Sequence, residues 1–254
     1  MLVRFVEIGL IVLASVFGGA LLGMLASRLL PDDHASSETK GVVSVSMAVL
    51  GTLSALVIGL LISTASGTFA TRSQEVTQMS ADVIRLDGLL RRYGPETQDI
   101  RELLRRYATM KLIDLFPDDS SQVAVDNEST LAVLEMLQDR VLALAPDDEA
   151  RRWLRLQALQ ITGAMLQTRW LLVQQSGTAI PFPLLVLMVF WLSVLFASFG
   201  LFAPRNTTVV LALFLCAVGV SGAVLMILDM ETPFGGVIRI SSTPMRHALE
   251  VIGR

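Results

Sequence analysis

Long runs of uncharged, mostly apolar residues alternate with polar segments along the chain. A helix that crosses a bilayer takes roughly 20 such residues, because the hydrocarbon is about 30 Å thick. Four runs are long enough, and they lie between Glu7 and Arg28, between Lys40 and Arg72, between Arg169 and Arg205, and from Asn206 to Leu228. A short polar turn is all that separates the last two runs, which predicts a helical hairpin.

The polar segment between the second and third runs has helical spacing of its apolar residues. No proline occurs from Val42 to Tyr93, so the second run is predicted to continue beyond the bilayer as one helix that ends at Gly94-Pro95. Apolar residues then recur three or four apart in three further segments. These are Ile100, Leu103, Leu104 and Tyr107; Leu131, Leu134, Leu137, Val141 and Leu144; and Leu154, Ala158, Ile161, Met165, Thr168 and Leu172.

These patterns predict an all-α integral membrane protein with four transmembrane helices and a cytoplasmic helical domain between the second and third. The expected parts are a transmembrane hairpin at 1–71, the helical domain at 72–169, a second hairpin at 170–230 and a cytoplasmic tail at 231–254. Composition agrees, with 53% hydrophobic and 17% charged residues. The net charge of -3 argues against nucleic-acid binding.

Basic residues predict the orientation in the membrane. Seventeen of the twenty Lys and Arg residues fall on the side that holds both termini and the helical domain, which the positive-inside tendency makes cytoplasmic. Four of them were expected to lie near span ends, namely Arg72, Arg85, Arg155 and Arg169. We therefore expect a multi-pass protein of the inner cell membrane. A signal peptide is the alternative for the first run, although its length exceeds a signal h-region.

Residues that could carry enzyme chemistry are scattered. His34 and His247 fall on opposite predicted sides of the membrane, and Cys216 lies alone within the fourth run. Asp229 and Glu231 close that run, where we expect both carboxylates to reach water at the membrane surface. The sequence predicts no enzyme activity, no metal site and no cofactor.

Two stripes of small residues mark the first two runs. Four residues recur every four positions in the first run, a spacing that lets helix backbones approach closely in lipid: Ser15, Gly19, Gly23 and Ser27. The second run has a small, weakly polar face formed by Ala48, Thr52, Ala55, Gly59, Ser63, Ser66 and Ala70. That face fits helix packing, and it also fits a pore wall in which several copies turn Thr52, Gly59, Ser63 and Ser66 toward a common axis.

Several motifs together resemble the bacterial membrane proteins called bestrophin-like. They are the repeated Leu-Leu-Arg-Arg-Tyr at 89–93 and 103–107, Ile180-Pro181-Phe182-Pro183 before Trp191, and a tail with Asp229, Pro233, Phe234, Gly236 and Pro244. The resemblance implies a pentameric channel for inorganic anions in which the second span lines the pore. Bestrophins end that span with Asn, an aromatic residue, Arg-Trp and an acid; here Ser66, Phe69, Arg72, Ser73 and Glu75 stand in those places, without the Asn and the Trp.

Two other classes of protein fit the same topology. One is a non-conducting membrane scaffold or sensor whose cytoplasmic helical domain docks a soluble partner. The other is a motor-type proton-channel subunit, which would need a separate single-span partner with an acidic residue. A channel requires a hydrated axial path in a symmetric homo-oligomer, whereas a scaffold requires a sealed helix bundle.

The predicted orientation can be tested by labelling single cysteines in a Cys216→Ser background. A cysteine at position 120 should react with an impermeant thiol reagent only after the membrane is opened, because residues 72–169 are expected to be cytoplasmic. Labelling of that cysteine from outside intact cells would reverse the assignment.

Overall fold

The computed structural model describes residues 2–29, 37–117, 123–174, 181–204 and 206–253. Within these ranges the regular structure is helical, which confirms the all-α prediction. The helices are α1 (Leu2–Ala26), α2 (Ser37–Tyr93), the short 3-10 helix η2 (Pro95–Thr97), α3 (Gln98–Leu115), α4 (Glu128–Leu142), α5 (Glu149–Gln174), α6 (Phe182–Phe202), α7 (Thr207–Met230) and α8 (Thr243–Ile252).

Among the described residues, four helices are long and apolar enough to cross a membrane, as predicted. The stretches are Val6–Ala26 in α1, Thr39–Tyr93 in α2, Pro183–Phe202 in α6 and Thr207–Met230 in α7. The chain is a multi-pass membrane protein. Its residues divide into a first unit (Met1–Thr68, Thr178–Thr232, Gly236–Ile238) and a second unit (Phe69–Gly177, Pro233–Gly235, Arg239–Arg254).

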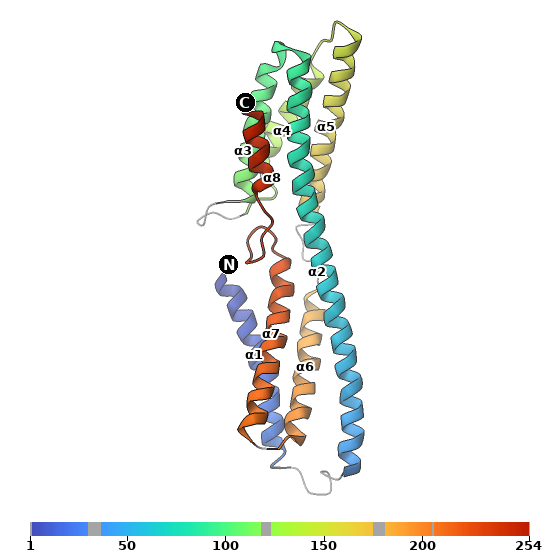
Figure 1. The fold of residues 1–254 in the computed structure, drawn as a ribbon, viewed down its shortest axis with the longest axis vertical. Helices are drawn as coiled ribbons and strands as arrows, with labels where there is room; N and C mark the ends of the chain where they lie inside the picture. Colours follow the sequence, from blue (N-terminus) through green and yellow to red (C-terminus); the bar gives the residue numbers. More distant parts are fainter. Residues whose placement is uncertain (1, 30–36, 118–122, 175–180, 205, 254) are drawn as a thin grey trace. The chain divides into compact units, whose positions relative to one another are not determined.

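The first unit contains α1, α6, α7 and the first part of α2 (Figure 1). Helices α1 and α6 touch through their backbones. A Cβ placed on Gly19 would lie 2.6 Å from the carbonyl oxygen of Ser193, and one on Gly23 would meet the carbonyl oxygen of Ala197. In return, a Cβ on Gly200 of α6 would meet the backbone of α1. Only glycine allows this approach, so the glycine pattern holds α1 against α6.

Helices α1 and α7 meet near the other end of α1. The Ser221 hydroxyl donates a hydrogen bond to the carbonyl oxygen of Gly9 at 2.7 Å, and a Cβ on Gly9 would lie 2.6 Å from the Leu225 side chain. Farther along, the rings of Phe17 and Phe214 form an edge-to-face pair with centroids 5.3 Å apart. This pair is a second contact between the two helices.

The second unit is a bundle of the remaining part of α2 with α3, α4, α5 and α8. Its core is apolar and includes Met79, Val83, Leu86, Leu90, Leu104, Tyr107, Leu134, Leu137, Met165 and Met245. Gly94 separates α2 from the next helix with φ at 140°, a conformation that favours glycine. Asn127 begins α4, since its side chain accepts a hydrogen bond from the Ser129 N–H.

Two features of the second unit differ from expectation. Helix α5 runs to Gln174, so Arg169 lies inside the bundle with 2% exposure and not at the end of a membrane span. The sequence analysis named residues 231–254 a tail and assigned no helix there; they include α8, whose Met245, Ala248 and Ile252 join the core. The sequence analysis missed α8 because ten residues give few repeats of the helical period.

The glycine contact between α1 and α6 predicts a sharp difference between two neighbouring residues. Gly19→Ala places a methyl group against a carbonyl oxygen that cannot move aside, and should cost about 1–3 kcal/mol of stability. Gly18→Ala should cost nothing, because a Cβ there meets no atom within 4 Å. Melting temperatures of the two variants in detergent compare them directly, and equal values would contradict the contact.

Candidate functional site

The first part of α2 packs with one face only inside the protomer. Ser54, Leu61 and Ala65 are buried on that face, and Leu61 and Ala65 belong to the apolar cluster that includes Leu185, Met188 and Leu192 of α6. Gly51 also faces α6, since a Cβ there would lie 3.8 Å from the Leu195 side chain. The side chains of α2 that secure it within its own chain therefore lie on the α6 side.

The candidate pore residues lie away from this packed face. Thr52, Gly59, Ser63 and Ser66 are all exposed in the single protomer. The Thr52 hydroxyl donates a hydrogen bond to the Ala48 carbonyl oxygen at 2.9 Å, a common arrangement for a hydroxyl on a helix. Next to this stripe, Leu53, Leu56 and Leu60 are exposed as well.

Of the four spans, α2 is the least covered by its own chain. In its most apolar window 11% of the residues are buried, compared with 33%, 28% and 22% for α1, α6 and α7. Its exposed surface combines the small, hydroxyl-bearing stripe with a flank of leucines. Such a surface can contact lipid, other copies of the chain, or water.

The predicted packing stripe on α1 is divided between two environments. Gly19 and Gly23 face α6 of the same chain, which identifies the neighbour that the sequence left open. Ser15 is exposed and donates its hydroxyl hydrogen to the Ile11 carbonyl oxygen at 2.8 Å. The Ser27 hydroxyl donates to the Met24 carbonyl oxygen, also at 2.8 Å. The glycines of the stripe thus make the close contact.

The carboxylate of Asp229 does not behave as expected. It is 8% exposed, and its two oxygens accept hydrogen bonds from the backbone N–H groups of Val237 at 2.8 Å and Ile238 at 2.7 Å. A Cβ on Gly236 would meet this carboxylate. The expectation that Asp229 reaches water was wrong, because the chain turns back and covers the carboxylate with its own backbone.

Two other residues of the tail motif belong to the second unit. The ring of Phe234 packs edge-to-face on Phe116, with centroids 5.8 Å apart. The Pro233 carbonyl oxygen accepts a hydrogen bond from the Ile240 N–H at 2.9 Å. These two contacts fix the path of the chain after α7, and neither of them indicates a catalytic or binding role.

A buried ionic cluster in the second unit escaped the sequence analysis. Lys111 is 1% exposed and donates to the Val125 carbonyl oxygen at 3.0 Å, while Arg169 pairs with Asp126. Asp114 accepts hydrogen bonds from the Asn127 amide at 2.7 Å and the Thr130 hydroxyl at 2.5 Å. Burial lowers the pKa of Lys111 to about 8, against the opposing effect of the Asp114 carboxylate. Lys111, Asp114 and Arg169 stand among apolar residues in amphipathic helices, so no sequence signal marks them as buried.

The remaining chemistry-bearing residues stay apart. His247 is exposed on α8 and Cys216 is exposed on α7. His34, Ile180, Asp118 and Asp119 lie outside the described residues.

Comparison with known proteins gives one family and one fold. The family profile of the bestrophin-like domain matches residues 14–245. Three crystal structures of a bacterial bestrophin homolog from Klebsiella pneumoniae, each carrying a mutation, are similar at 15% sequence identity, with TM-scores of 0.65, 0.64 and 0.64. Each alignment covers 94% of this chain and at least 99% of the other. No curated protein matches the chain.

A single added methyl group, at Gly236, tests whether the turn after α7 depends on its contact with the Asp229 carboxylate. Gly236→Ala should displace the Asp229 carboxylate and weaken its two hydrogen bonds to the backbone, at a cost of about 1–3 kcal/mol. Hydrogen exchange at the amides of Val237 and Ile238 should accelerate. Gly222→Ala is the control, because a Cβ at that exposed position meets no atom within 4 Å. Unchanged exchange in the Gly236 variant would show that the turn does not depend on these bonds.

Proposed function

The chain belongs to the bestrophin-like family, and we propose that it forms a homo-oligomeric channel for inorganic anions. In this proposal each copy turns the exposed stripe of α2 toward a central ion path. Resemblance supports a pentamer, and the distribution of basic residues supports a cytoplasmic location for both termini and for residues 72–169. The proposal uses no cofactor and no metal.

The observation that carries the proposal is the exposure of Thr52, Gly59, Ser63 and Ser66 beside a buried face at Leu61 and Ala65. Because α2 is attached to its own chain through the buried face, the stripe remains available to line a path. Hydroxyl groups suit such a wall, since they can replace some of the water around a passing ion. Exposed leucines beside the stripe offer apolar surface for contacts between copies.

Charge along α2 supports an anion as the permeating ion. Between Lys40 and Arg72 the helix carries no charged residue, and both residues that bound this stretch are basic. A ring of carboxylates, which attracts cations in cation channels, is therefore missing from the proposed wall.

The proposal can be tested by flux measurements on protein reconstituted in liposomes. In a Cys216→Ser background, single cysteines replace Ser63 or Ser66 on the stripe, and Leu53 or Leu60 on the flank. Charged thiol reagents should reduce chloride flux at least severalfold at the stripe positions and much less at the flank positions. A negatively charged reagent should reduce anion flux more than a positively charged one, because it repels the permeating ion.

Two results would contradict the channel. If thiol reagents reduced the flux equally at the stripe and the flank positions, the stripe of α2 would not line the ion path. Absence of flux from a protein that is folded and oligomeric would favour the scaffold or sensor, in which the second unit docks a partner.

A further inference from the structure

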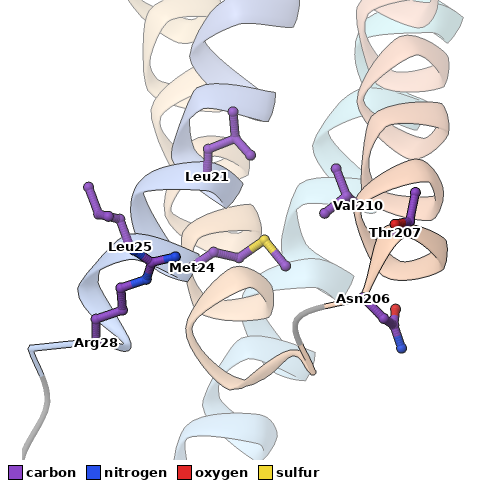
Figure 2. A pocket seen from close by; sticks show the side chains of 7 residues that line it. All are labelled: Leu21, Met24, Leu25, Arg28, Asn206, Thr207 and Val210. Carbon is purple, nitrogen blue, oxygen red and sulfur yellow. The ribbon is translucent and has the colours of Figure 1, made fainter.

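A groove opens in the first unit where α1 ends and α7 begins. It measures about 460 Å³ and is lined by Leu21, Met24, Leu25, Arg28, Asn206, Thr207 and Val210. Figure 2 shows these side chains on two facing helices, with Met24 of α1 directed toward α7. The groove lies entirely within the first unit and is separate from the exposed stripe of α2.

The packing of α1 explains why the groove exists. Near Gly9, α1 lies close against Leu225 of α7, and in the middle the two helices meet through the Phe17–Phe214 pair. Beyond that pair, Gly23 holds α1 against α6, so α1 is not free to close on the start of α7. The space beside Met24 and Val210 therefore stays open, because the glycine contact keeps this end of α1 on α6.

The walls of the groove change character along its length. Leu21, Met24 and Val210 make the part toward the middle of the spans apolar, and the end of the groove carries Arg28 and Thr207. Arg28 is the first charged residue after α1 leaves its apolar run, and no carboxylate is among the described residues that line the groove. An apolar trough with a cation at its polar end complements a lipid that has an acyl chain and a phosphate.

We propose that this groove binds one anionic glycerophospholipid of the bilayer. An acyl chain lies along Leu21, Leu25 and Val210, and the phosphate faces the Arg28 guanidinium. Two observations favour a lipid over another copy of the chain. The polar residues cluster at the ends of both spans, the depth at which headgroups lie, and the positive charge of Arg28, which no carboxylate of the described lining residues accompanies, suits a phosphate. The lipid would complete the contact between α1 and α7 that the helices leave unfilled.

Native mass spectrometry of the full-length protein with added phosphatidylglycerol or phosphatidylcholine tests the proposal. Arg28→Ala should weaken phosphatidylglycerol binding about fivefold, the effect of one cation near a phosphate, and Arg28→Lys should restore most of it. The matched control is Lys40→Ala, which removes a basic residue from the same end of the unit but outside the groove. Phosphatidylcholine binding should change little in any of these variants.

A second pair of variants tests the apolar wall. Val210→Trp fills the groove and should reduce binding of both lipids, whereas Val218→Trp, at an exposed position of α7 outside the groove, should not. Equal losses in Arg28→Ala and Lys40→Ala would overturn the proposal, since diffuse charge would then explain the binding. It would also be overturned if Val210→Trp changed the oligomeric mass but left lipid binding intact, because another copy of the chain would then occupy the groove.

Discussion

The close approach of the α1 and α6 backbones determines how the rest of the first unit is arranged. Within a bilayer, burial from water does not drive helices together, so association depends on van der Waals contact between close surfaces. Gly19 and Gly23 on one helix and Gly200 on the other remove the side chains that would keep the backbones apart. With α1 held in this way, α7 contacts it at Gly9 and through the Phe17–Phe214 pair, and the buried residues of the first part of α2 pack with α6.

The second unit is stabilised by a different set of interactions. This unit is a helix bundle with an apolar core, and burial of Leu86, Leu104 and Leu137 supplies the driving force for its folding. The buried charges of Lys111 and Arg169 are costly there unless they are paired. Their bonds to Val125 and Asp126 attach the segment before α4 to the bundle, so the ionic cluster specifies the path of that segment more than it adds stability.

The sequence was sufficient to predict the fold wherever a long pattern existed. Four apolar runs and a proline-free α2 are properties of many residues at once, so a few exceptions do not hide them. The positions of Arg169 and Asp229 could not be predicted, because each depends on one partner distant in sequence or on a turn of the chain. For the candidate site, the small stripe of α2 was visible from residue spacing. Residue spacing does not show which neighbour the stripe faces, because that depends on tertiary contacts.

The sequence left two explanations of that stripe, helix packing and a pore wall. The structure shows which side of α2 packs within the first unit. Packing among the described residues of the first unit uses another face, at Leu61 and Ala65, and leaves Ser63 and Ser66 exposed. A surface that only met lipid would favour larger apolar side chains, such as the exposed Leu53 and Leu60 beside the stripe. In the proposed channel, the stripe meets a neighbouring copy or an aqueous path. In a symmetric ring both arise from one arrangement, because the copies that bring their stripes to an axis also bring their leucine flanks against one another.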